Sequence, residues 1–371
     1  MSDCYWQPML DVSPAQEVFT PKKHKDTGLP VTGREKVLQQ CEQTNPIPFT
    51  ECISPAMLNK CVKIGEGVYG EVFRTSNRRQ SVALKIIPIE GDFEVNDEPQ
   101  KTFDEILPEI VISRELSYLS EGDVNYSNNY IGVNNVSCVQ GRYPETLLTQ
   151  WDKYDSRKGS ENDRPDIFDD EQLYIVFEFA DGGQDLESFE FNNLQQAISI
   201  FQQTAGALAV AEKELEFEHR DLHWGNVLIR STKQDHVIFY LDDQEYRIAS
   251  HGLEVSIIDF TLSRLQKDEC TIFCDLAADP TLFDGAGDYQ FQIYRNMKKK
   301  TSINNWEPYE PHTNVLWLHY LADKLINSKT YQDSDTKAHK SALATLRSFY
   351  RHLLSHSSAE QVVVESELLD L

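Results

Sequence analysis

The sequence lacks the features that mark secreted and membrane-spanning proteins. It holds seven cysteines, an odd number, and no C-x-x-C pair, which favours reduced thiols in an intracellular protein. Cys270 and Cys274 are close in sequence, but no nearby His or Cys completes a zinc site. No apolar run is long enough to cross a bilayer, and the first residues lack the charged and apolar segments of a secretory leader. These absences predict a soluble protein that is not secreted.

Positive charge is also scarce. The chain has 35 Lys and Arg against 60 Asp and Glu, a formal net charge of -25. So acidic a surface repels nucleic-acid phosphates and favours a basic polypeptide as partner, although acidity also simply aids solubility. Charge alone does not decide between these two interpretations. With 371 residues, 40% of them apolar, the chain is long enough for two cores and an extension.

The segment 219–226, which reads H-R-D-L-H-W-G-N, is the most informative feature of the chain. An apolar stretch ending in Asp259 follows, 38 positions after Asp221. Transfer of a γ-phosphoryl group to a hydroxyl needs a carboxylate to orient the hydroxyl, plus an Asn and a second Asp to hold Mg²⁺ on the nucleotide phosphates. We predict these roles for Asp221, Asn226 and Asp259. Either segment alone is common, but together they predict a phosphoryl-transfer centre.

A glycine-rich segment upstream supplies the expected nucleotide site. It reads I-G-E-G-V-Y-G-E-V and comprises Ile64, Gly65, Glu66, Gly67, Val68, Tyr69, Gly70, Glu71 and Val72. Glycines let the backbone turn tightly and approach phosphates without Cβ atoms in the way. A Rossmann loop would open a helix, whereas here residues 71–74 continue as a strand and meet a second strand at 81–87. This context favours the kinase form of the loop.

The second strand carries V-A-L-K, in which Lys85 is predicted to contact the α- and β-phosphates of ATP. Such a lysine needs a carboxylate partner. Pro108 suits the first turn of a helix and would place Glu109 just inside it, so we predict a Lys85–Glu109 pair. Glu105 and Glu115 are the competing partners.

These motifs, together with residues 101–109, 162–166, 217–228, 287–291 and 314–321, resemble the haspin-like kinases. The resemblance covers residues 50–355. It implies an α+β, bilobal protein-kinase fold that uses ATP and Mg²⁺ to phosphorylate serine or threonine in a protein. The implied substrate is a threonine near the N-terminus of histone H3, and the implied location is the nucleus and the mitotic chromosomes.

Two departures from ordinary protein kinases bear on mechanism. Asp259-Phe260-Thr261 replaces D-F-G, which removes a flexible glycine, and no A-P-E follows. Asp288, which we expect to open a large helix, comes only 29 positions after Asp259, so the activation segment is short. The resemblance implies activity without activation-loop phosphorylation.

The second departure is His223, which stands where serine/threonine kinases usually have a lysine. A histidine there suits a hydrogen-bond donor or a substrate contact, because it carries charge only near its pKa of ~6.5. D-L-H-x-G-N also resembles the loop of aminoglycoside and choline phosphotransferases, so a small-molecule kinase is one alternative. A pseudokinase scaffold is the other alternative. The joint presence of Lys85, Glu109, Asp221, Asn226 and Asp259 argues against it, because a scaffold need not keep all five.

Further site residues follow the apolar strand at 173–179. The adenine and ribose are expected to contact Ala180, Asp181, Gly182, Gly183, Gln184 and Asp185. Expected substrate contacts are Gly183, Asp185, Glu187, His223 and Asp279. Phe177 and Phe179 fit the gatekeeper position equally well.

The expected organisation is a disordered or loosely packed tail at 1–50, an N-lobe at 51–179, a C-lobe at 180–355 and an acidic tail at 356–371. A stripe at helical spacing predicts a core helix in the C-lobe; it comprises Leu194, Ala197, Ile198, Phe201, Ala205, Leu208 and Ala209. We expect a monomer that neither reads nucleic acid directly nor contacts a membrane, and whose association with chromatin is indirect.

Overall fold

The computed structural model describes residues 31–301, 305–365 and 368–370. The described residues form two compact units. Unit 1 comprises 31–111 and 132–181, and unit 2 comprises 112–131 and the residues from 182 onward. The expected lobe boundary at 179/180 is thus two residues from the observed one. Segment 112–131, expected in the N-lobe, belongs to unit 2, where the Tyr126 and Ile131 amides donate to the Tyr240 and Ile257 carbonyls.

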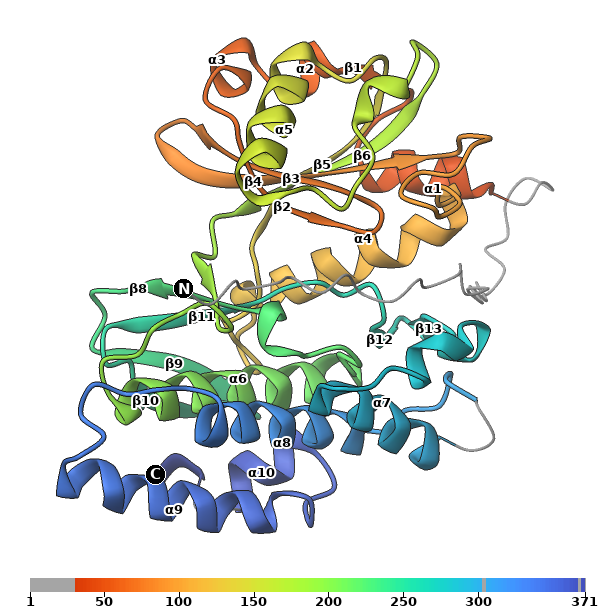
Figure 1. The fold of residues 1–371 in the computed structure, drawn as a ribbon. Coiled ribbons are helices and arrows are strands. Elements are labelled where there is room, and N and C mark those ends of the chain that lie inside the picture. Colours follow the sequence, from red (N-terminus) through yellow and green to blue (C-terminus); the bar gives the residue numbers. More distant parts are fainter. Residues whose placement is uncertain (1–30, 302–304, 366–367, 371) are drawn as a thin grey trace. The chain divides into compact units, whose positions relative to one another are not determined.

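Unit 1 is built on a six-stranded sheet with strand order β1-β5-β6-β4-β3-β2 (Figure 1). The strands are β1 (Ile47–Pro48), β2 (Val62–Gly67), β3 (Gly70–Asn77), β4 (Gln80–Ile89), β5 (Val133–Gln140) and β6 (Leu173–Ala180). β1 runs parallel to β5, and the other neighbours are antiparallel. The predicted strands on either side of residues 75–80 are confirmed as β3 and β4, whose pairing sets Val72 opposite Lys85.

The helices of unit 1 include a segment that the sequence did not reveal. They are α1 (Gly33–Gln40), α2 (Phe49–Cys52), α3 (Pro55–Leu58), α5 (Glu145–Lys158) and the first part of α4 (Phe103–Tyr118). Thr32 and Glu35 form a capping box at the start of α1, and Val37 is fully buried. The expectation of a loosely packed tail is therefore wrong for residues 33–50. The remainder of that expectation, residues 1–30, lies outside the described residues.

Unit 2 is mainly helical around α6 (Leu194–Leu215) (Figure 1). Asn193 caps the start of α6, and all seven residues of the predicted stripe are buried, which confirms the core helix. The other helices are α7 (Tyr289–Lys300), α8 (His312–Asn327), α9 (Lys337–Leu353) and α10 (Ala359–Glu365). The strands are β7 (Gln184–Asp185), β8 (Val227–Ser231), β9 (His236–Leu241), β10 (Gln244–Ala249), β11 (Leu253–Ile257), β12 (Arg264–Lys267) and β13 (Cys270–Phe273).

The C-terminal segment is also more ordered than expected. α10 packs against α6 and buries Val362. Glu212 of α6 accepts hydrogen bonds from the Ala359 and Glu360 amides at 3.0 and 2.8 Å, which satisfies donors at the start of α10. The expected acidic tail is therefore wrong for residues 359–365. Among the described residues, no helix is long and apolar enough to cross a membrane.

Phe49 provides a test of whether residues 33–50 belong to the folded unit. Its ring packs against Tyr174 and Tyr143, with centroids 5.0 and 6.0 Å apart. We expect Phe49→Ala to lower the free energy of unfolding by about 3–5 kcal/mol, because a buried aromatic ring is lost and a cavity remains. Urea unfolding followed by tryptophan fluorescence measures this change. The neighbouring exposed residue offers a control, Thr50→Ala, which should have little effect; equal stability of the two variants would contradict the packing described here.

Candidate functional site

In unit 1, Lys85 pairs with Glu109, as predicted. Its Nζ lies 2.7 Å from Glu109 Oε1. The second carboxylate oxygen of Glu109 lies 3.3 Å from Nζ of Lys101, so the buried carboxylate is held between two lysines. The Lys101 ammonium also lies over the ring of Tyr69, 4.7 Å from its centroid. Lys101 thus links the glycine-rich loop to the Lys85–Glu109 pair, a link that sequence reasoning missed.

The helix that carries Glu109 starts earlier than predicted. α4 begins at Phe103, so Pro108 lies inside the helix and not in its first turn. Thr102 and Glu105 form reciprocal hydrogen bonds, a capping box that was readable in the sequence as T-x-x-E. The Glu105 carboxylate therefore accepts a hydrogen bond from the Thr102 amide at the start of the helix. Glu115 forms an ion pair with Lys267 at 2.8 Å. Neither competing carboxylate is the partner of Lys85.

The glycines of the loop have distinct environments. A Cβ on Gly70 would lie 2.1 Å from the Ile86 carbonyl oxygen, so only glycine fits beside β4. A Cβ on Gly67 would meet nothing within 4 Å among the described residues, and one on Gly65 only Val72 at 4.0 Å. Gly70 therefore allows close strand pairing, whereas Gly65 and Gly67 leave room over the backbone.

The acidic side chains of the glycine-rich loop are paired within unit 1. Glu66 and Glu71 both form ion pairs with Lys63, which is only 1% exposed. The Lys63 ammonium also lies over the rings of Trp151 and Tyr154 of α5, at 5.3 and 4.6 Å. Burial raises the pKa of Glu71, against the lowering effect of Lys63. Of the predicted nucleotide-binding residues, Glu66 and Glu71 can therefore contribute only through their backbone.

Two asparagines bind the loop backbone directly. Asn162 Nδ2 donates to the Gly67 carbonyl at 3.1 Å and to the Glu71 carboxylate at 2.9 Å. Asn96 Nδ2 donates to the Val68 carbonyl at 2.8 Å. Asn96 and Asp163 in turn exchange two hydrogen bonds, at 2.7 and 3.1 Å. These contacts join the loop to segments distant in sequence, and no local pattern indicates such partners, which is why they were missed.

In unit 2, strand pairing brings Asn226 next to Asp259. β8 and β11 are antiparallel, with Val227 opposite Ile257, so the residue before β8 meets the residues after β11. The Ile258 amide donates to the Asn226 carbonyl at 3.0 Å. Asp221 belongs to the same cluster, because its carbonyl accepts a hydrogen bond from Asn226 Nδ2 at 2.8 Å. The three predicted residues are therefore close together.

The catalytic-loop backbone is held in an uncommon conformation. Arg220 and Asp259 have φ values of 65° and 60°, in the left-handed region, a feature often found at functional sites. His219 is fully buried and bridges the two segments through contacts with the Asp221 amide at 3.3 Å and the Ile258 carbonyl at 3.1 Å. Burial lowers the pKa of His219 to about 4, so its ring is neutral.

Thr261, which stands in place of the usual glycine, fixes the Asp259 carboxylate. Its amide and its hydroxyl both donate to Asp259 Oδ1, at 3.2 and 2.7 Å. Phe260 between them is buried, and its ring packs against Tyr130 and Phe217. The threonine therefore replaces a flexible position with a side chain that orients Asp259.

His223 is a neutral hydrogen-bonding group. Its Nδ1 accepts from the Gly225 amide at 3.0 Å, so the ring proton resides on Nε2. Burial lowers its pKa to about 4. His223 therefore cannot supply the positive charge of the lysine that it replaces, but it can donate one hydrogen bond.

The segment 180–185 contains the junction of the two units, with Ala180 and Asp181 in unit 1 and the following residues in unit 2. Gly183 has φ +92°, and a Cβ there would lie 2.1 Å from the Ile229 carbonyl oxygen. Gln184 and Asp185 form β7, which pairs with β8. In unit 1, Phe177 is fully buried opposite Lys85, and Phe179 is partly exposed.

The expected substrate residues of unit 2 differ in burial. Glu187 is exposed, and Asp185 accepts hydrogen bonds from Ser188. Asp279 is 2% exposed. Its Oδ1 accepts from the Thr281 amide at 2.9 Å, whereas its buried Oδ2 has no hydrogen-bond partner among the described residues. An unsatisfied buried carboxylate oxygen is costly, so Asp279 is the candidate that most needs a partner.

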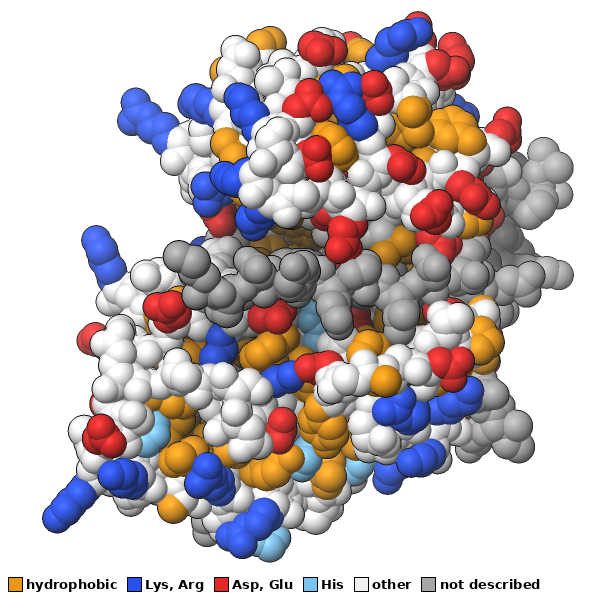
Figure 2. All heavy atoms as spheres, in the orientation of Figure 1, with side chains coloured by type: hydrophobic (Ala, Val, Ile, Leu, Met, Phe, Trp, Pro, Cys, Tyr) orange, Lys and Arg blue, Asp and Glu red, His pale blue; other side chains and the backbone are white. Residues whose placement is uncertain are grey.

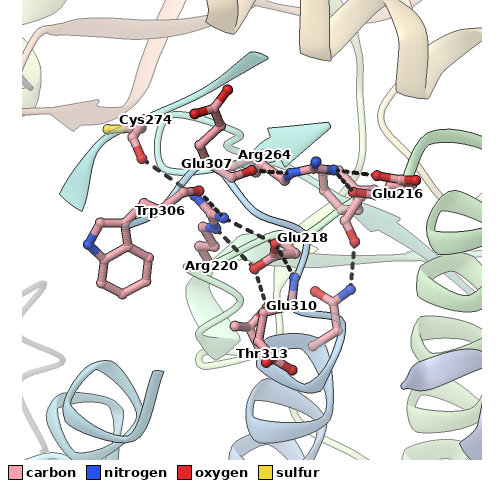
Figure 3. Close-up of polar contacts among 12 residues, drawn as sticks. Glu216, Glu218, Arg220, Arg264, Cys274, Trp306, Glu307, Glu310 and Thr313 are labelled. Atoms are coloured by element: carbon pink, nitrogen blue, oxygen red, sulfur yellow. Dashed lines mark hydrogen bonds and ion pairs between the residues drawn. The ribbon is translucent and has the colours of Figure 1, made fainter. Parts of the chain in front are cut away.

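Arg220, the residue before Asp221, forms a buried ion pair with Glu218 in unit 2 (Figure 3). Both side chains are 0% exposed, and two parallel hydrogen bonds of 3.1 Å join them. The Arg220 guanidinium also donates to the Trp306 carbonyl at 2.7 Å and lies over the Trp306 ring. Its charge is therefore balanced and its donors are used within the protein.

Glu218 also forms hydrogen bonds with residues from other segments of unit 2 (Figure 3). Its carboxylate accepts from the Glu310 amide and the Thr313 hydroxyl, both at 2.9 Å. Its backbone pairs with that of Arg264, whose guanidinium donates to the Glu216 carbonyl at 2.7 Å. The cluster thus fixes the chain before Asp221 to the chain after Asp259.

A magnesium site is compatible with the residues present. Within the described ranges, no group of three or more His, Cys, Asp or Glu side chains is placed to hold a metal by itself. Asn226 donates with its side-chain nitrogen to the Asp221 carbonyl, which leaves its side-chain oxygen as the atom that could bind a metal, and Asp259 adds a carboxylate. Carboxylate and amide oxygens suit Mg²⁺, which commonly takes its remaining ligands from water and substrate phosphates.

Surface charge does not locate a partner by itself. Figure 2 shows acidic and basic side chains together on the visible face of each unit. The net charge of -25 is therefore no guide to one particular surface.

Comparison with known proteins agrees with this geometry. The family model described as "Haspin like kinase domain" matches residues 16–368. The chain is 50% identical to the serine/threonine-protein kinase haspin of Mus musculus over 90% of this chain and 45% of that protein. The identity is 48% with the haspin of Bos taurus, over 96% and 46%, and 41% with the haspin homolog of Drosophila melanogaster, over 88% and 58%. The chain thus spans about half the length of the curated relatives it matches.

The β-rich unit 1, the helical unit 2 and the paired motifs define a protein kinase domain. With the match over residues 16–368 and identities of 41–50%, the chain belongs to the haspin-like kinase family.

The asparagine contacts to the glycine-rich loop generate a prediction. Asn162→Ala removes hydrogen bonds to the Gly67 carbonyl and to Glu71, each worth about 0.5–1.5 kcal/mol, so we expect a looser loop. The KM for ATP should rise about 3- to 10-fold, and amide hydrogen exchange in residues 65–72 should accelerate. Asn134→Ala is the matched control, because Asn134 donates only at an exposed site on Glu178. Equal exchange in the two variants would refute a restraining role for Asn162.

Proposed function

We propose that this chain is an ATP- and Mg²⁺-dependent serine/threonine protein kinase. Its proposed substrate is a threonine near the N-terminus of histone H3. The observation that carries the proposal is the close grouping of Asp221, Asn226 and Asp259 in unit 2, in a chain whose other unit holds the Lys85–Glu109 pair. Together with the family membership, this set supports phosphoryl transfer from ATP to a protein hydroxyl.

Each residue has a proposed role. Asp221 orients the acceptor hydroxyl and takes up its proton, and Lys85, held by Glu109, contacts the nucleotide phosphates. Asn226 and Asp259 would hold Mg²⁺, which neutralises phosphate charge when bound. The backbone of the glycine-rich loop covers the phosphates, and residues 180–185 lie along the adenine and ribose.

The histone substrate is supported by chemistry and by family. Asp279 offers a buried oxygen that has no hydrogen-bond partner in the described part of the chain, and Asp185 and Glu187 add negative charge in the same unit. A lysine- and arginine-rich tail supplies the donors that such groups accept. By the same reasoning we propose that the protein acts in the nucleus on mitotic chromosomes, as a monomer whose association with chromatin is indirect.

The two alternative functions are less well supported. The family match, including a complete glycine-rich loop, argues against a small-molecule phosphotransferase. The Lys85–Glu109 ion pair and the Thr261 contacts that orient Asp259 argue against a pseudokinase scaffold. A scaffold has no need to maintain these contacts.

The test is a phosphoryl-transfer assay with ATP and Mg²⁺ on core histones, on a set of small amine alcohols, and on buffer alone. We expect phosphate on a threonine of histone H3. Asp221→Asn and Lys85→Ala should each lower kcat about 100-fold or more, with thermal melting close to that of the wild type. Transfer to the amine alcohols alone would favour the small-molecule alternative, and no transfer beyond the buffer rate would favour the scaffold.

We also propose that the kinase is active without activation-loop phosphorylation. In kinases switched by phosphorylation, arginines pair with the added phosphate and order the loop. Arg220 already has an internal carboxylate partner in Glu218 and is fully buried. The buried pair therefore provides the negative charge that a phosphate would otherwise bring.

Phosphatase treatment tests this second part. Protein made in bacteria should keep the same kcat after treatment, because no phosphate is needed to neutralise Arg220. Glu218→Gln should lose activity in treated and untreated protein alike, since it leaves Arg220 buried without a counter-charge, a change typically worth about 3–5 kcal/mol. The exposed pair Glu245–Arg247 provides a control, Glu245→Gln, which should leave activity unchanged. A large, reversible loss of wild-type activity on phosphatase treatment would overturn the proposal.

A further inference from the structure

The Asp221 carboxylate has a side-chain partner that the sequence motifs do not indicate. Tyr294 lies in α7, and its hydroxyl donates a hydrogen bond to Asp221 Oδ1. Both side chains are buried, Tyr294 with 3% of its surface exposed and Asp221 likewise with 3%. Among the described residues, this is the one side-chain hydrogen bond to the Asp221 carboxylate.

Tyr294 is itself rigidly held. Its ring packs against Trp317 of α8 in an edge-on arrangement, with centroids 5.3 Å apart. Asp288 is the N-cap residue of α7: its side chain accepts a hydrogen bond from the Gln290 amide at 2.9 Å and also pairs with Lys324 of α8. Because its helix is anchored at the cap and its ring is packed, the phenol can fix the direction of the carboxylate.

The Tyr294 contact matters because His223 stands where a lysine usually lies close to the catalytic aspartate. His223 is neutral, and its Nδ1 is occupied by the Gly225 amide, so it does not balance the charge of Asp221. A buried carboxylate oxygen without a donor is costly, so Asp221 needs a hydrogen bond from another group.

We propose that Tyr294 is a positioning residue for phosphoryl transfer: its hydroxyl holds Asp221 Oδ1, so that Oδ2 is directed to the acceptor hydroxyl. This inference rests on the proposed kinase function and names a residue that acts through Asp221. Burial raises the pKa of Tyr294 well above its usual range, so the phenol keeps its proton and acts as the donor.

Removal of the phenol hydroxyl would take away the one side-chain hydrogen bond to the Asp221 carboxylate among the described residues, so the carboxylate would lose its fixed direction. The effect should therefore fall on kcat and leave nucleotide binding unchanged.

Tyr294→Phe tests the proposal, with histone H3 peptide, ATP and Mg²⁺ as substrates. We expect kcat to fall about 10-fold, because the carboxylate loses the hydrogen bond that directs it, with little change in the KM for ATP. Tyr331→Phe is the matched control, because it removes the hydroxyl of another buried tyrosine, one that donates to the Leu325 carbonyl at 2.7 Å. The control should keep the wild-type kcat and KM for ATP.

A second substitution covers the outcome in which Tyr294→Phe does not fold. Site-specific 3-fluorotyrosine at position 294 keeps both the ring and the hydrogen-bond donor, so kcat should stay within about two-fold of the wild type. A kcat lowered about 10-fold by 3-fluorotyrosine, or a Tyr294→Phe variant with wild-type kcat, would overturn the inference. Because both are compared with an active wild type and an inactive Asp221→Asn, failure of the inference is distinguishable from failure of the proposed function.

Discussion

The buried ion pair between Arg220 and Glu218 is the interaction on which the site in unit 2 most depends. Its two side chains are 0% exposed, so the pair is stable only while every donor and acceptor around it is satisfied. Those partners are Trp306 and Glu310 in the segment before helix α8 and Thr313 in its first turn. The catalytic loop therefore cannot move without disturbing several distant segments, which gives Asp221 a fixed position.

In unit 1, buried and paired charges likewise restrain the glycine-rich loop. Lys63 is buried between the carboxylates of Glu66 and Glu71 and the aromatic rings of α5. Asn162 adds hydrogen bonds to the loop backbone. A glycine-rich loop gains flexibility from its sequence, and these contacts restrain it. In both units, buried charge that is fully paired orders backbone that would otherwise be free to move.

Several elements could be predicted because their signals are local. The apolar stripe of α6 repeats at helical spacing, and the V-A-L-K strand follows a glycine-rich turn, so periodicity and composition were sufficient. The pairing of Lys85 with Glu109 was also predictable, but the start of its helix was not, because Pro108 was taken as a first-turn residue and the Thr102–Glu105 capping box went unrecognised. The order of residues 33–50 was missed because their burial depends on distant strands.

The sequence by itself determined which chemical groups are present: the glycines of the loop, the lysine of β4, and the Asp and Asn residues of the catalytic segments, all fixed by spacing within short motifs. Only the tertiary structure decided which groups meet. Tyr294 is 73 positions from Asp221, and Arg220 is 86 from Trp306, so no local pattern links them. Such contacts arise from helix packing and strand pairing, whose register depends on the whole buried core.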